Sequence, residues 1–131
     1  MAKIYGLTLV IFLILDSVWL GVISPGLYQE KIGHLLADEV NWPAAALFYL
    51  LFIAGLVFFA VKPSLGQNSW KTALKNGAFF GLVCYATYDL TNHATMRDWP
   101  LMITVIDLLW GTFICGISSL VSFFAVRKLL K

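Results

Sequence analysis

Three aspartates, Asp16, Asp89 and Asp107, lie inside apolar stretches that are each long enough to cross a bilayer. An ionised carboxylate within a membrane costs about 2.5–3.5 kcal/mol on insertion scales. Three together therefore oppose insertion by roughly 8–10 kcal/mol unless they are paired, hydrated or protonated. Helix packing alone does not require carboxylates. We therefore predict that these residues form a binding or proton-relay site.

The run of residues 85–93, which surrounds Asp89, is the densest polar stretch in the chain. Asp89 and His93 stand at positions i and i+4, and Asn92 lies beside them on the same helical face. Tyr88 precedes the aspartate and carries a hydroxyl group. We include Tyr88, Asn92 and His93 among the candidate binding or proton-relay residues.

A metal ion is a second hypothesis for this chemistry. Carboxylate and imidazole groups at i and i+4 can bind one metal ion, and this spacing occurs twice, in Asp89 with His93 and in Glu30 with His34. A surface pair that only forms a hydrogen bond has the same spacing, so both interpretations stay open. Two histidines are too few for a membrane di-iron oxygenase, and no Cys-x-x-Cys, P-loop or dinucleotide-binding glycine pattern occurs. The sequence therefore assigns no cofactor.

Asp16 and Asp107 share a local pattern, because each is followed three residues later by a tryptophan, Trp19 or Trp110. On antiparallel helices Trp19 lies above its aspartate and Trp110 lies below, so we expect the indoles to close the aspartate cluster from both ends. Their N–H groups can donate hydrogen bonds to carboxylates. The alternative, in which each tryptophan only packs or anchors its helix, stays open.

The composition indicates that the elements carrying these residues are membrane helices. The chain has 131 residues, of which 60% are hydrophobic and 12% charged, and its mean hydropathy is +0.85. A soluble domain of this size is far less apolar. We expect an all-α integral membrane protein, a single domain over residues 1–131, with four transmembrane helices in an antiparallel bundle. The predicted spans, each near or above the roughly 20 residues that cross the hydrocarbon core, are residues 4–23, 42–61, 73–93 and 99–126.

The basic residues predict the orientation. Seven of the nine lysines and arginines fall at the two termini and in the second connection, so the positive-inside bias places both termini in the cytoplasm. The first outer connection is long and has apolar residues at helical spacing, which predicts a short interfacial helix over about residues 26–37. The second connection, residues 63–69, reads as a turn-rich loop.

Two helix starts carry nearly the same signal, Asn-Trp-Pro at residues 41–43 and Asp-Trp-Pro at residues 98–100. Asn41 or Asp98 is expected to cap the free amides, proline suits the first turn, and tryptophan suits the membrane interface. The helix after Asn41 has only Tyr49 as an interior polar group, so we expect it to act as scaffold.

Depth along the helices predicts that the three carboxylates meet. At 1.5 Å per residue, Asp16 and Asp107 both lie roughly 10 Å below the outer boundary, and Asp89 lies somewhat closer to it. Gly77 and Gly81, one turn apart on the third predicted span, permit a close approach of a neighbouring helix. We therefore expect one aspartate layer in the outer half of the bilayer.

These motifs resemble a family of small bacterial membrane proteins with four helices, known as a domain of unknown function. The resemblance covers nearly the whole chain. It implies a multi-pass protein of the bacterial inner membrane without an established activity. It also implies a gene association with lipid-modifying enzymes such as cyclopropane-fatty-acid synthases. The matching stretches are residues 15–21, 41–43, 85–92, 98–100 and 107–111.

Three functions are compatible with the sequence. The first, which we favour, is binding or transport of a proton, a cation or an amphiphilic small molecule through the aspartate cluster, by a homodimer. The second is a lipid- or isoprenoid-modifying enzyme in which one aspartate is a general acid and another a base. The third is a structural partner subunit whose carboxylates are satisfied by Tyr88, Thr91, Asn92 and the tryptophans. The expected partners are the lipid bilayer and a lipid or small-molecule ligand, with no nucleic acid.

Overall fold

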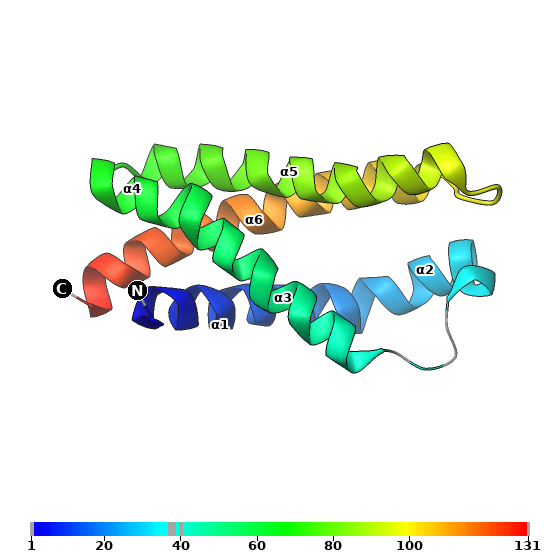
Figure 1. Ribbon diagram of the computed structural model, residues 1–131, viewed down its shortest axis with the longest axis horizontal. Helices are drawn as coiled ribbons and strands as arrows, with labels where there is room; N and C mark the ends of the chain where they lie inside the picture. Colours follow the sequence, from blue (N-terminus) through cyan, green and yellow to red (C-terminus); the bar gives the residue numbers. More distant parts are fainter. Residues whose placement is uncertain (1, 37–38, 40, 131) are drawn as a thin grey trace.

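The computed structural model describes residues 2–36, 39 and 41–130, and every regular element in this part of the chain is helical (Figure 1). The first helical run begins with α1 (Ala2–Val18) and passes through a π-helical turn, η1 (Trp19–Ile23), into α2 (Ser24–Ile32). A single 3₁₀ turn, η2 (Gly33–Leu35), ends it. The expectation of an all-α protein is confirmed for the described residues.

The second helical run has the same construction. Helix α3 (Trp42–Leu56) passes through a π-helical turn, η3 (Val57–Val61), into α4 (Lys62–Gln67). Two long helices follow, α5 (Trp70–Thr95) and α6 (Leu101–Leu129). Figure 1 shows α5 beside α6 over most of their length, α3 crossing obliquely, and both chain ends at the same end of the molecule.

Three helical runs of the described chain are long and apolar enough to cross a membrane. They are Ala2–Ile23 with 22 residues, Trp42–Gln67 with 26 and Leu101–Leu129 with 29. They contain or overlap three of the four predicted spans. The remaining one, residues 73–93, lies within α5, which has 26 residues but is more polar than the other three runs.

Each π-helical turn precedes a helix with a proline in its first turn. A proline has no N–H group and its ring clashes with the carbonyl four residues earlier, so it normally ends or kinks a helix. A π turn admits one extra residue and changes the hydrogen-bond register locally, which lets the helical path continue.

The prediction of a loop over residues 63–69 is wrong for its first residues, because α4 continues to Gln67. The helix ends at Asn68, which adopts a left-handed conformation with φ of 50°.

The helix predicted over about residues 26–37 is present as α2 and η2, although residue 37 lies outside the described part of the chain. It follows directly from α1 through η1, and Figure 1 shows it continuing the direction of α1. Apolar contacts hold it in this place, because Ile32, with Leu27 and Tyr28 beside it, packs against Trp99, just before α6, and Ile103 in the first turn of α6.

The two predicted helix caps have different outcomes. Asn41 caps α3, because its side-chain oxygen accepts a hydrogen bond of 3.2 Å from the backbone N–H of Ala44. The prediction for Asp98 is wrong, since α6 begins only at Leu101 and its first turn has no side-chain cap. The Asp98 carboxylate instead lies 3.5 Å from the imidazole of His34.

Helices α5 and α6 approach each other through glycines, as the sequence predicts. A Cβ atom added to Gly81 would lie 2.1 Å from the carbonyl oxygen of Gly111, and one added to Gly77 would lie 2.6 Å from the carbonyl oxygen of Cys115. Both distances are shorter than any ordinary contact. The two backbones therefore lie in direct contact along this seam, in the first half of α5.

Candidate functional site

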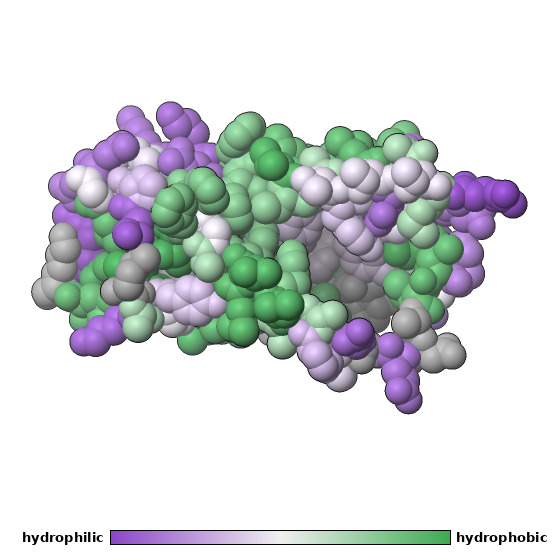
Figure 2. All heavy atoms as spheres, in the orientation of Figure 1, coloured by the Kyte–Doolittle hydropathy of each residue, from purple (hydrophilic) through white to green (hydrophobic). Residues whose placement is uncertain are grey.

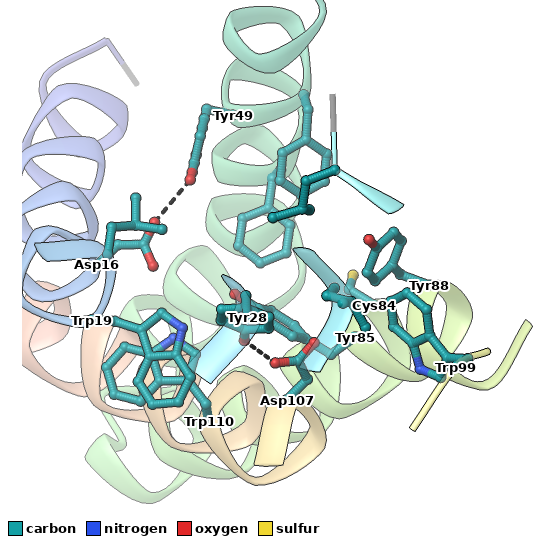
Figure 3. Close-up of a pocket in the computed structure, with 15 residues that line it drawn as sticks. Asp16, Trp19, Tyr28, Tyr49, Cys84, Tyr85, Tyr88, Trp99, Asp107 and Trp110 are labelled. Carbon is teal, nitrogen blue, oxygen red and sulfur yellow. Dashed lines mark hydrogen bonds between the residues drawn. The ribbon is translucent and has the colours of Figure 1, made fainter. Parts of the chain in front are cut away.

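A cavity of about 530 Å³ lies between the helices and is lined by fifteen residues (Figure 3). Figure 2 shows the surface hollowed between α3 and α5, on the side of the molecule where α2 lies. Nine lining residues are aromatic, two are aspartates, and none of these described residues is basic. The lining residues are Asp16, Trp19, Leu20, Tyr28, Ile32, Leu36, Phe48, Tyr49, Phe52, Cys84, Tyr85, Tyr88, Trp99, Asp107 and Trp110.

Asp16 projects from the C-terminal end of α1 and is 5% exposed. Its carboxylate accepts a hydrogen bond of 2.8 Å from the hydroxyl of Tyr49 on α3. The indole N–H of Trp110 also approaches this carboxylate, but it is buried and outside hydrogen-bond geometry with any described acceptor. The prediction that α3 is only a scaffold is therefore wrong, because α3 supplies the donor that satisfies Asp16.

Asp107 projects from α6 into the same cavity and is 4% exposed. Its carboxylate accepts a hydrogen bond from the hydroxyl of Tyr28 on α2 (Figure 3). Burial, together with the neighbouring Asp107 carboxylate, raises the pKa of Tyr28 well above that of a free tyrosine. Tyr28 is therefore a neutral donor at any physiological pH, and it links α2 to the carboxylate on α6.

Asp89 lies behind Asp107 and does not line the cavity. Its side chain is completely buried, and its carboxyl group lies within hydrogen-bonding reach of the Asp107 carboxyl group. No donor from the described residues reaches either of its oxygens. Asp16 and Asp107 thus face the same cavity, and Asp89 lies beside Asp107, enclosed between α5 and α6.

The two tryptophans form one wall of the cavity. Trp19 and Trp110 stack with their ring centroids 4.4 Å apart and their planes 11° from parallel (Figure 3). The expectation that they close the aspartate cluster from opposite ends is therefore wrong. Trp19 is the first residue of the π-helical turn η1 and is buried.

The polar residues around Asp89 divide into two groups. Tyr88 lines the cavity and contacts Trp99 edge to face, with ring centroids 5.7 Å apart. Asn92 and His93 do not line it, and Nδ1 of His93 lies 3.5 Å from the hydroxyl of Thr104. The hydroxyl of Thr91 donates to backbone carbonyls of its own helix. The aspartates that face the cavity are therefore satisfied by tyrosines of α2 and α3, not by Thr91 and Asn92.

The structure does not gather the predicted metal ligands. Within the described residues, no group of three or more His, Cys, Asp or Glu side chains is placed to hold a metal ion. His34 faces Asp98, and both side chains are more than half exposed. Glu30 on α2, which lies four residues before His34, is also exposed.

Sequence reasoning did not assign the two hydrogen-bond donors, Tyr28 and Tyr49, or the cavity-lining Tyr85 and Trp99. A signal was present for Tyr49, which is the lone polar residue inside its helix. It follows Trp42 by seven residues, which at 1.5 Å per residue is roughly 10 Å, the depth deduced for Asp16 and Asp107. No comparable signal marks Tyr28, because its contact with Asp107 depends on the path of α2.

The long apolar helices, with an acidic and aromatic cavity between them, are those of an all-helical membrane protein. The chain belongs to the family described as Predicted membrane protein (DUF2177), which matches residues 1–124 and has no established function. This match confirms the family resemblance seen in the sequence. No curated protein and no solved structure matches the chain.

Proposed function

We propose that this protein binds an amphiphilic cation in the cavity between α1, α2, α3, α5 and α6. One observation carries the proposal: two carboxylates and nine aromatic side chains line the cavity, and none of the described lining residues is basic. Carboxylates attract a positive head group, and the faces of Trp and Tyr rings add roughly 0.5–2 kcal/mol for each well-placed cation. An apolar tail suits the remaining walls.

The position of the opening supports entry from the lipid. The hollow in Figure 2 lies on the side of the helices and not at their ends, so in a membrane it faces the bilayer. Its margin includes apolar side chains that are themselves exposed, among them Leu20 at 52% and Phe48 at 54%. Such a margin favours a ligand that is already dissolved in the membrane over one that arrives from water.

The proposal includes α5 as a fourth span and a cytoplasmic location of both termini, in a bacterial inner membrane. Helix α5 is long enough to cross, and its wholly buried Asp89 is covered by α6 instead of facing lipid. Lys3, Lys62, Lys71 and Arg127 lie on segments at the end of the molecule that carries the termini (Figure 1). The positive-inside bias places that end in the cytoplasm, and the cavity then lies in the outer half of the bilayer.

A pair of probes with the same shape and opposite charge tests the proposal. Tetraphenylphosphonium and tetraphenylborate are titrated into the purified protein in lipid nanodiscs. The signal is the tryptophan fluorescence, to which Trp19, Trp99 and Trp110 of the cavity contribute. We expect saturable quenching by the cation and none by the anion. Asp16→Asn and Asp107→Asn should each weaken binding of the cation about tenfold or more, a change of about 1.4 kcal/mol.

The matched control is Glu39→Gln, which removes one exposed acid on the same side of the predicted topology without touching the cavity. This variant should bind the cation like the unmodified protein. Equal quenching by both probes, or equal affinity in Asp107→Asn and Glu39→Gln, would show that the carboxylates do not select a cation and would refute the proposal. Flux of tetraphenylphosphonium into reconstituted vesicles then separates transport from binding.

The contact between Asp89 and Asp107 favours a second candidate, a lipid- or isoprenoid-modifying enzyme. Two carboxyl groups within hydrogen-bonding reach titrate apart, so that one can act as an acid while the other acts as a base. Because Asp107 also faces the cavity, a lipid held there would meet the pair. A lipid profile of a deletion strain, complemented with the unmodified gene or with Asp107→Asn, tests this function. Identical profiles in all three strains would exclude it.

A further inference from the structure

We propose that Asp89 and Asp107 share a single proton, and that a cation bound beside Asp107 displaces this proton. Asp89 is then the proton-holding residue of the site, and Asp107 is the residue that meets the ligand. The inference rests on the proposed function, since it specifies how binding in the same cavity is coupled to protons.

The burial of both carboxyl groups favours one proton shared between Asp89 and Asp107. Asp89 is 0% exposed and Asp107 is 4% exposed, and their carboxyl groups lie within hydrogen-bonding reach of each other. Two ionised carboxylates in such a contact repel strongly, and an isolated buried charge is already costly. No described donor reaches either oxygen of Asp89. A proton between the two groups removes one charge and supplies the missing hydrogen bond.

Among the described residues, no neighbouring cation neutralises the pair. On α5 the nearest group that can become positive is His93, one turn beyond Asp89, and it is exposed and lies beside Thr104. The other titratable groups near the pair are tyrosines, namely Tyr28 on α2 and Tyr85 and Tyr88 on α5. Further titratable groups of the same cavity are Asp16 on α1, Tyr49 on α3 and Cys84 on α5, and none of them is basic.

The positions of the two carboxyl groups give them different tasks. Asp107 contacts the cavity, Tyr28 and Asp89, whereas Asp89 does not line the cavity. A cation beside Asp107 lowers the free energy of a second negative charge in the pair without touching Asp89. The O–H bond of the shared proton breaks, the cation replaces the proton, and the total charge of the site is unchanged. The proton leaves through the cavity, which is open at the surface.

This exchange predicts the sign of the pH dependence. At low pH the pair holds its proton firmly and competes with the cation, so affinity is weak. As pH rises, affinity increases by about tenfold per pH unit if one proton is released, and it levels off once the free pair has lost its proton. If binding involved only a permanently ionised Asp107, the affinity for the cation would not change with pH in this way.

Proton counting by calorimetry tests the inference. Tetraphenylphosphonium is titrated into the protein in nanodiscs at one pH, in buffers with different ionisation enthalpies, and the dependence of the observed heat gives the protons released per bound cation. We expect about one proton for the unmodified protein and for Glu39→Gln. Asp89→Asn, which keeps the shape of a protonated aspartate, should bind the cation without releasing a proton and without a pH slope.

The outcomes separate the two proposals. Failure of the unmodified protein to bind tetraphenylphosphonium refutes the proposed function, and with it this inference. Binding without proton release refutes the inference alone, as does undiminished release by Asp89→Asn. If that variant does not fold, an infrared difference spectrum of the unmodified protein decides instead. Loss of a protonated-carboxyl band on binding supports the shared proton, and an unchanged band contradicts it.

Discussion

The close approach of α5 and α6 at Gly81 predicts a large effect of one added methyl group. In the variant Gly81→Ala the new Cβ would lie 2.1 Å from the carbonyl oxygen of Gly111 and 2.7 Å from Cβ of Cys115. Neither neighbour is the flexible end of a long side chain, so α5 and α6 must separate by roughly 1 Å. Overpacking of this kind costs about 1–3 kcal/mol, and the loss of contact along the seam adds to it.

The control for this variant is Gly6→Ala on α1, where an added Cβ meets nothing within 4 Å. Alanine is the better helix former by about 0.5–1 kcal/mol, so Gly6→Ala should leave the free energy of unfolding unchanged or raise it slightly. Reversible unfolding in mixed micelles, followed by circular dichroism, measures both variants. We expect Gly81→Ala to be less stable than Gly6→Ala by about 1–3 kcal/mol. Equal stabilities would refute the tight α5–α6 seam, and with it the enclosure of Asp89.

Two further predictions concern hydrogen bonds that the structure assigns. Tyr49→Phe removes the donor to Asp16. Because a hydrogen bond to a charged group contributes about 1.5–3 kcal/mol, we expect the free energy of unfolding, measured in mixed micelles, to fall by this amount. The double variant with Asp16→Asn should recover part of the loss, and purely additive effects would contradict a direct bond. Asn41→Ala removes the cap of α3 and should lower the free energy of unfolding by about 1 kcal/mol, whereas Asn41→Ser, which keeps a capping oxygen, should lower it by much less. Equal losses in the two Asn41 variants would show that the cap does not stabilise α3.

Several features follow from local sequence alone. The apolar runs and their lengths predict the helices, and the Asn-Trp-Pro signal predicts the cap at Asn41, because both depend on residues close in the chain. The constant rise of a helix predicts similar depths for Asp16 and Asp107, and both residues line the same cavity. The glycines of α5 likewise predict a close helix–helix contact.

Other features depend on the rotation and path of whole helices. Trp19, the first residue of the π-helical turn η1, stacks on Trp110, and this turn leads into α2, from which Tyr28 reaches Asp107. Asp98, predicted as a helix cap, lies before the first turn of α6 and faces His34.

The sequence by itself determined that three aspartates lie inside long helices of an all-helical membrane protein. Only the tertiary structure decided their separate environments: Asp16 beside Tyr49, Asp107 beside Tyr28, and Asp89 enclosed without a described donor. The physical reason is that the rise of a helix specifies how deep each residue lies along the helix axis, and its periodicity specifies which residues share one face of that helix. The orientation of each helix toward its neighbours is set by packing between residues that are distant in the chain, and this packing determines which groups share the cavity.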